Sequence, residues 1–355
     1  MIQTQTQLHD FLHRIKDETE LAIDTEFKWT NTYYPKLCLL QIASETVADC
    51  IDILAIENLA PLFDKLYQKN MLWIAHAAHN DIEVLYRYSK QLPSQVFDTQ
   101  IAPDLLKNLR PEGANFGAQM SYQTLTEILQ SITLEKAYTR LDWTTRPLPE
   151  EAIEYALDDV RYLIKNYHQL KAQLNNEQKL NWLMEEGQSL LNIDLYEVDI
   201  FQSWQKVKGF SRLPKQMRHL AAQLAAWREY CAIDKDKPRR WILSDNDLIN
   251  IVLGKDGLSD KKQQAFEYFL AKYPQSNEII YDTRQHTPPT AEEKAQKAIL
   301  QKAIQEKANQ YNLTMEIIVN SKTLLRYIRG DQSVNFLSGW RFNLLKEELK
   351  KCKIV

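Results

Sequence analysis

Residues 21–27 read LAIDTEF, and this run of apolar residues leads directly into two acids spaced i and i+2. Alternate side chains of a strand leave the same face, so Asp24 and Glu26 would present two carboxylates side by side at the end of a core segment. Like charges this close repel unless a cation lies between them, and carboxylate oxygens suit Mg²⁺ or Mn²⁺ better than zinc. The alternative for an isolated DxE is a strand that runs out into a polar turn. Partners elsewhere in the chain must decide between the two.

The segments around this stretch alternate between strand and helix patterns. Strand patterns cover residues 20–27, 37–43, 47–52, 71–75 and 96–100, and helix patterns cover residues 6–16, 58–67, 80–88 and 121–130. Pro149 at a first helical position, followed by two glutamates, predicts one long helix from about residue 150 to residue 174. The first part of the chain is therefore mixed α/β, and the closely spaced strands 37–43 and 47–52 are expected to be antiparallel.

Beyond residue 195 the patterns become almost entirely helical. A second change follows at the rigid, polar run Thr287-Pro288-Pro289-Thr290. We therefore predict three domains, at residues 1–200, 201–288 and 289–355.

The overall composition is that of a globular protein, with 44% hydrophobic and 26% charged residues. No apolar run approaches the length of a membrane span, and the amino terminus lacks the pattern of a secretory signal. The cysteines (Cys38, Cys50, Cys231 and Cys352) show no CxxC spacing, so neither a disulfide framework nor a zinc site is indicated. We expect a cytoplasmic protein with no membrane partner.

The net charge of −3 hides an asymmetry along the chain. Residues 1–200 contain 17 Lys and Arg against 30 Asp and Glu, a net −13, whereas residues 201–355 contain 27 against 17, a net +10. An acidic first part suits cations and a basic second part suits a polyanion such as nucleic acid. The alternative is that helical surfaces merely differ in their solvating charges.

Two later segments offer partners for the first pair of acids. On the predicted helix after Pro149, Tyr155 and Asp159 are one turn apart and share a face, with Asp159 beside the apolar stripe and Asp158 further towards solvent. Asp81 falls in the first turn of the helix after His79-Asn80, where an acid alone is explained by the helix dipole. His76 and His79 lack a third soft ligand, so zinc is not favoured.

In this order, Asp24, Glu26, Asp81 and Asp159, joined by Tyr155, resemble the DEDDy exonucleases. The resemblance extends to the runs DTEF, YYPKLCLLQIA, HAAHND, FDT, DWTTRPLP and YALDDVRYL, while WREYCAIDKDKPRRWIL and FLSGWRFNLL are similar to HRDC modules. On these motifs the chain resembles the ribonuclease D family. The resemblance implies an α/β RNase H-like exonuclease domain, with a mixed sheet flanked by helices, followed by two all-α HRDC-like domains.

The resemblance also implies a function and a set of roles. It implies a 3′→5′ exoribonuclease that releases nucleoside 5′-monophosphates from RNA 3′ ends, mainly of tRNA precursors, and acts as a monomer. The four acids would hold two divalent ions, Mg²⁺ or Mn²⁺. Tyr155 would orient the attacking water, because a phenol with a pKa near about 10 is a poor general base. The alternatives are a DNA 3′→5′ exonuclease and a catalytically silent RNA-binding protein.

Substrate contacts are predicted for a second group of residues. Phe27 is a candidate for stacking on the terminal nucleotide, with an ordinary core aromatic as the alternative. Lys136, Arg140, Trp143 and Arg146 form a basic and aromatic loop that could hold phosphates. For two of them the alternatives are structural, since Trp143 could pin the loop and Arg146 could pair with an acid. Arg239 and Arg240 would add salt-sensitive binding.

Overall fold

A computed structural model describes residues 1–109, 119–135, 138, 141–274 and 287–351. The chain divides into two compact units. The first comprises Met1–Lys28, Leu37–Tyr196 and Pro289–Val355, and the second comprises Trp29–Lys36 and Glu197–Pro288.

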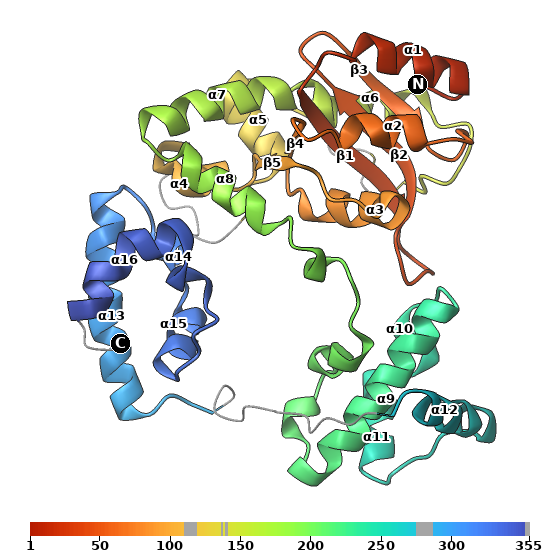
Figure 1. The fold of residues 1–355 in the computed structure, drawn as a ribbon, viewed down its shortest axis with the longest axis vertical. Helices are drawn as coiled ribbons and strands as arrows, with labels where there is room; N and C mark the ends of the chain where they lie inside the picture. Colours follow the sequence, from red (N-terminus) through yellow and green to blue (C-terminus); the bar gives the residue numbers. More distant parts are fainter. Residues whose placement is uncertain (110–118, 136–137, 139–140, 275–286, 352–355) are drawn as a thin grey trace. The chain divides into compact units, whose positions relative to one another are not determined.

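The first unit is built on a five-stranded sheet of order β3-β2-β1-β4-β5 (Figure 1). The strands are β1 (Glu20–Lys28), β2 (Lys36–Ala43), β3 (Ala48–Asp52), β4 (Leu72–Ala75) and β5 (Gln95–Asp98). β4 is parallel to both β1 and β5, whereas β2 and β3 are antiparallel, so the sheet is mixed. The strand that carries the DxE pair therefore lies at the centre of the sheet.

Helices cover both faces of this sheet (Figure 1). They are α1 (Gln5–Arg14), α2 (Ala60–Leu66), α3 (His79–Ser89), α4 (Ala102–Leu105), α5 (Tyr122–Gln130), α6 (Glu150–Arg161), α7 (Leu163–Asn176) and α8 (Leu180–Ser189), with a 3₁₀ turn at Lys107–Leu109.

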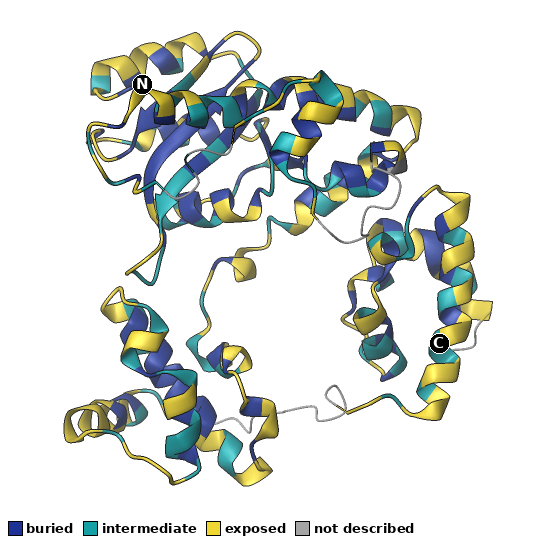
Figure 2. Ribbon diagram, turned by 180° about the vertical axis from the view of Figure 1, so that it is seen from behind, coloured by how far each residue is buried: buried dark blue, intermediate teal, exposed yellow. Residues whose placement is uncertain are grey.

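Alternation along β1 divides its side chains between two cores. Figure 2 colours the ribbon by burial and shows that the strands of the sheet consist largely of buried residues. Leu21 and Ile23 pack in one core with Leu8 of α1, whereas Ala22 packs in the other with Leu170 of α7. All five side chains are fully buried. Asp24 and Glu26 lie two and four residues after Ala22, so their side chains leave the strand on the same face as Ala22. This is the face covered by α6 and α7.

The prediction of one continuous helix over residues 150–174 is wrong, because the structure has two helices there, α6 and α7, which meet at Tyr162. At this residue the side chain of Gln130, from α5, donates through Nε2 to the carbonyl of Tyr162 at 2.9 Å. That carbonyl also accepts the backbone N–H of Asn166 at 3.0 Å, so Gln130 bonds to it without displacing the main-chain bond of α7. Buried apolar residues continue on both sides of Tyr162, so the periodicity of the sequence does not show where the helix divides.

The last helices of the chain belong to the first unit. They are α13 (Ala291–Gln310), α14 (Met315–Ile318), α15 (Ser321–Ile328) and α16 (Gly339–Lys351), with a 3₁₀ turn at Asn335–Leu337. Trp340 of α16 stacks on Trp182 of α8, with ring centroids 4.7 Å apart, and Arg341 pairs with Glu186. These helices share the core that contains Ala22.

The second unit is helical around its own core of buried residues, which includes Leu224, Trp227 and Phe269. Its helices are α9 (Lys215–Asp234), α10 (Arg239–Ile242), α11 (Asp245–Val252) and α12 (Asp260–Lys272). Two 3₁₀ segments of the same unit precede them, at Ile200–Lys206 and Phe210–Arg212. A further 3₁₀ segment, at Ile193–Leu195, lies within the range of the first unit. The three-domain division and the HRDC-like character of residues 201–288 and 289–355 stay predictions.

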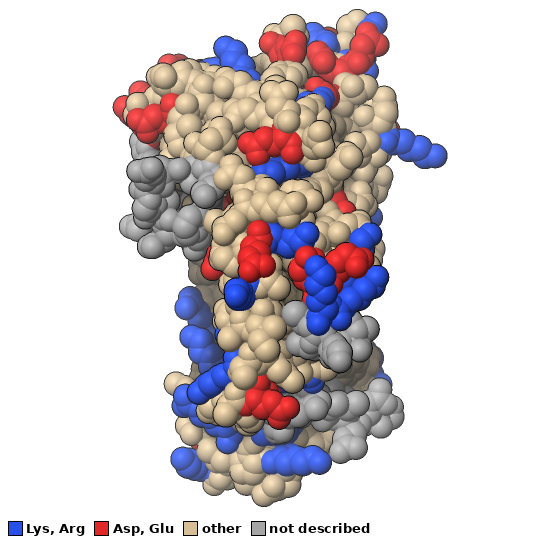
Figure 3. Space-filling view, turned by 90° about the vertical axis from the view of Figure 1, so that its left-hand side faces the viewer, with Lys and Arg blue, Asp and Glu red and all other residues tan. Residues whose placement is uncertain are grey.

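Charge is unevenly distributed over the molecule, as the sequence indicates. On the face drawn in Figure 3, Lys and Arg side chains gather in some regions and Asp and Glu side chains in others. Within the described part of the chain, no helix combines the length and apolarity that crossing a membrane requires.

Candidate active site

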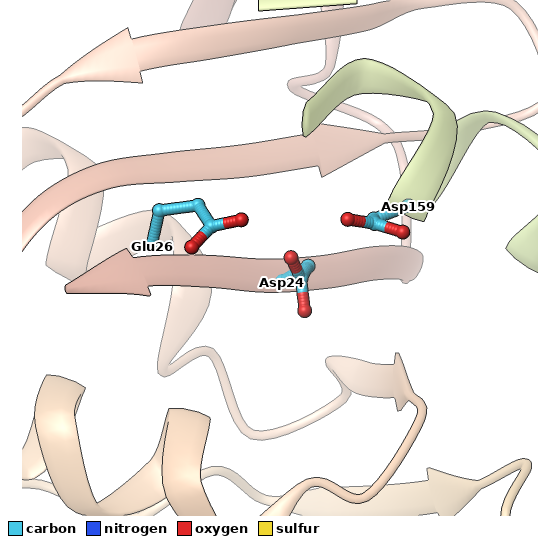
Figure 4. Close-up of side chains that lie close together, drawn as sticks. All are labelled: Asp24, Glu26 and Asp159. Carbon is cyan, nitrogen blue, oxygen red and sulfur yellow. The ribbon is translucent and has the colours of Figure 1, made fainter. Parts of the chain in front are cut away.

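Three carboxylates meet on the face of the sheet that α6 covers. Asp24 and Glu26 come from β1 and Asp159 comes from α6, and each offers an oxygen so that all three lie within 4.8 Å of one another. Figure 4 shows the three side chains pointing toward a common space between strand and helix. The inward orientation predicted for Asp159 is confirmed, whereas its neighbour Asp158 forms an ion pair with Arg161 at 2.7 Å.

Asp81 stands next to this cluster but is not part of the group of three. It is buried in the first turn of α3, where its Oδ1 accepts a hydrogen bond from the Thr25 hydroxyl at 2.6 Å. Burial, followed by repulsion from Asp24, raises the pKa of the Asp81 carboxyl well above its usual range. Asp81 and Asp24 are therefore close enough for their carboxylate charges to repel each other.

Asp98, at the end of β5, holds the turn that leads into α3. Its two carboxylate oxygens accept the backbone N–H groups of Ala77 at 2.9 Å and Ala78 at 3.0 Å. Ala77 has a positive φ of 65°, a conformation that a non-glycine residue rarely adopts without such support. Asp98 thus positions the start of the helix that carries Asp81. The FDT run of the sequence contains Asp98, but nothing in the local pattern indicates this supporting role.

The electrostatics of the three clustered carboxylates suit a cation. Burial raises the pKa of Asp24, and burial together with repulsion from Asp24 raises the pKa values of Glu26 and Asp159. Without a counter-charge the ionised forms are unfavourable, and a divalent cation bound by their oxygens would relieve the repulsion. The donor set, carboxylates only, fits a hard cation such as Mg²⁺ or Mn²⁺.

Tyr155 lies one turn before Asp159 on α6 and is half-buried. Burial, followed by the charges of Asp159 and Glu26, raises the pKa of its phenol above the usual value. The hydroxyl therefore stays protonated at physiological pH and can orient a polar group but not serve as a base. A pocket of about 540 Å³ opens beside Tyr155 and Asp159 and is lined also by Tyr138, Glu151 and Glu154.

Neither histidine near α3 belongs to a metal-ligand group among the described residues. His76 is held between the Thr99 hydroxyl and the Met120 carbonyl, each at 3.0 Å, and burial lowers its pKa to about 4. His79 stacks on Tyr196 with ring centroids 5.3 Å apart. Both side chains have structural partners.

The geometry supports the structural alternatives for two of the predicted substrate contacts. Trp143 is 2% exposed and packs in a core with Ala152 and Ala156 of α6. Arg146 pairs with the buried Asp52 through two bonds of 2.6 and 2.7 Å. Phe27 is half-buried against the core of β1, and Lys136 and Arg140 lie outside the described residues.

Comparison with known proteins agrees with this geometry. Residues 1–175 match the family model described as 3′-5′ exonuclease. Ribonuclease D of Bartonella henselae is 30% identical over an alignment of 376 positions, gaps included, which covers 100% of this chain and 90% of that protein. Ribonuclease D of Sphingobium indicum is 35% identical over 253 residues, covering 71% of this chain and 63% of that protein.

Among solved structures, Escherichia coli RNase D, described as an exoribonuclease involved in structured RNA processing, superposes with a TM-score of 0.84 at 24% identity. The match covers 99% of this chain and 97% of that one. Fold and site together define a 3′→5′ exonuclease with an RNase H-like catalytic domain, and the predicted fold class is confirmed. The chain belongs to the ribonuclease D family.

Proposed function

We propose that this 3′→5′ exoribonuclease trims RNA 3′ ends, those of tRNA precursors among them, and releases nucleoside 5′-monophosphates by hydrolysis with two divalent cations, Mg²⁺ or Mn²⁺. The observation that carries this proposal is the convergence of Asp24, Glu26 and Asp159 within 4.8 Å. We further propose that the chain acts as a monomer in the cytoplasm; buried cysteines that form no disulfide, such as Cys50 and Cys231, suit a reducing compartment.

The residues take distinct roles in this mechanism. Asp24, Glu26, Asp81 and Asp159 would hold the cations, which when bound would stabilise the attacking and the leaving oxygen of the scissile phosphate. Tyr155 keeps its proton and orients the attacking water through its hydroxyl. Thr25 and Asp98 hold Asp81 in place through the hydrogen bonds described above.

The acidic surroundings also explain why catalysis would depend on cations. Glu151, Glu154 and Asp158 line the pocket beside Tyr155, together with Asp159. A phosphate entering this region meets repulsion from these carboxylates unless positive charge intervenes. Cations held by the clustered carboxylates would supply that charge where the scissile bond must lie.

The test is release of 5′-mononucleotides from a 3′-end-labelled RNA, comparing wild type with Asp24→Asn. We expect metal-dependent release that falls by more than about 100-fold in the variant, because loss of a residue that only hydrogen-bonds to a metal ligand already costs about 10- to 100-fold. Asp10→Asn is the matched control, since this exposed acid lies on α1, whose core is on the other face of the sheet from the carboxylate cluster. A DNA oligomer of the same sequence tests the sugar preference. Equal loss in both variants, or no release from any RNA, would contradict the proposal.

A further inference from the structure

Two tryptophans of the second unit expose half of their surface. Trp29 is 53% exposed in the segment that follows β1, and Trp241 is 52% exposed in α10. Tryptophan is mostly well buried in folded proteins, so large exposed rings of this kind often mark an interaction surface.

The segment that carries Trp29 is fastened to α9. The Tyr33 hydroxyl donates to the carboxylate of Glu229, and the backbone N–H of Tyr33 donates to Asp236 at 2.9 Å. The indole N–H of Trp29 donates in turn to the Tyr33 carbonyl at 3.1 Å. Through these bonds the position of Trp29 is determined by the helix.

Trp241 is connected to the same group of side chains. Arg239, two residues before it, pairs with Glu229 at 3.3 Å and lies 5.9 Å from the centroid of the Tyr33 ring. Glu229 is fully buried, and a buried carboxylate is tolerated only when its partners stay in place. Trp29 and Trp241 are therefore held by one shared set of contacts rather than by two independent loops.

Cations accompany the exposed rings. The Lys237 ammonium lies 5.9 Å from the centroid of the Trp241 ring, and the exposed Arg240 immediately precedes Trp241. Aromatic faces that stack on bases, next to cations that meet phosphates, are the combination used to bind single-stranded nucleic acid without sequence preference. Trp29 also follows Glu26 by three residues, so the chain itself keeps the two Cα atoms within about 10 Å.

We propose that Trp29 and Trp241, with Lys237 and Arg240, form a surface on which unpaired nucleotides upstream of the RNA 3′ end stack. This inference rests on the proposed function and adds to it a binding surface outside the carboxylate site. Its occupant is a single strand, because two rings with adjacent cations match unstacked bases and their phosphates.

The test measures binding and turnover separately. Affinity for a dye-labelled single-stranded RNA of about 12 nucleotides, a length within the range single-strand sites cover, is measured by anisotropy with metal withheld, in the full chain. We expect Trp29→Ala and Trp241→Ala each to weaken binding by about 5- to 100-fold, as loss of one stacked base does. Tyr268→Ala, at a ring of α12 that is 65% exposed and so more accessible than either tryptophan, is the control and should leave affinity unchanged.

Turnover then separates this inference from the proposed function. A dinucleotide has no nucleotide upstream of the two that the scissile phosphate joins, so its rate of cleavage should be the same in wild type and both tryptophan variants, while kcat/KM for the long RNA falls. Unchanged affinity in the double variant, or equal losses on the two substrates, would overturn the inference. Failure of wild type to cleave either RNA would instead overturn the proposed function, and the binding measurement would still decide this inference.

Discussion

Thr25 lies between the two acids of β1 in sequence but, by strand alternation, faces the opposite side. Its buried hydroxyl donates to Asp81 at 2.6 Å. We expect Thr25→Val to weaken metal activation, because Asp81 loses a hydrogen bond that favours its ionised form. The midpoint of the Mn²⁺ activation curve should rise by about 10-fold or more.

Thr25→Ser is the matched variant for this position, since it keeps the hydroxyl and removes only a methyl group. Its activation midpoint should stay close to that of wild type. Equal shifts in the valine and serine variants would mean that packing, not the hydrogen bond to Asp81, accounts for the effect.

Tyr155 illustrates how surroundings decide the role of a side chain. Its raised pKa keeps the phenol neutral, so we expect Tyr155→Phe to lower kcat by about 10- to 100-fold while the metal activation midpoint stays unchanged. The pH profile of the wild-type enzyme should show no loss of activity from phenol ionisation below about pH 10. A shifted metal midpoint in the phenylalanine variant would contradict this orienting role.

At the scale of elements, α8 depends on one glycine. A Cβ built at Gly187 would lie 2.1 Å from the carbonyl oxygen of Val96 in β5, far inside contact distance. We expect Gly187→Ala to lower the free energy of unfolding by about 1–3 kcal/mol or more, because helix and strand must separate. Urea denaturation of both proteins measures this difference.

The control for that prediction is Gly257→Ala. A Cβ at Gly257 would meet nothing within 4 Å, and this glycine has no positive φ. Its free energy of unfolding should change by less than about 0.5 kcal/mol, as for other surface substitutions. If both variants were equally stable, the close approach of α8 to β5 would not be a constraint on the fold.

At the scale of the whole molecule, the carboxylate cluster links stability to pH and metal. The pKa values of Asp24, Glu26 and Asp159 are raised in the folded protein, so between about pH 4 and these raised values the folded state binds more protons than the unfolded chain. Their contribution to stability is therefore present at low pH and is lost as the pH rises through the raised values.

Without metal, we accordingly expect Asp24→Asn to raise Tm at about pH 8 but to have little effect at about pH 5. A gain of about 1 kcal/mol corresponds to roughly 2–4 °C for a domain of this size. Mn²⁺ should stabilise wild type at the higher pH and much less the variant. Thermal scans in chelator and in Mn²⁺ check this, and a variant less stable than wild type at the higher pH would contradict it.

The sequence alone determined the elements that depend on local pattern. The apolar run before Asp24 defines a buried strand, the i and i+2 spacing of Asp24 and Glu26 directs both to one face, and the apolar stripe after Pro149 turns Asp159 inward. These features depend on the spacing of apolar residues, which repeats every two residues in a strand and about every 3.6 residues in a helix and can be read from the sequence itself. The family resemblance then placed Asp81 and Tyr155 with them.

Only the tertiary structure decided what depends on contacts between distant residues. The hydrogen bond from Thr25 to Asp81, the support of the α3 turn by Asp98 and the hydrogen bond from Gln130 to Tyr162 each join segments that sequence spacing does not connect. Burial likewise assigned Trp143 to a core and Arg146 to Asp52. Whether a side chain is buried or paired depends on the residues that surround it in space, and the local sequence pattern does not specify those residues.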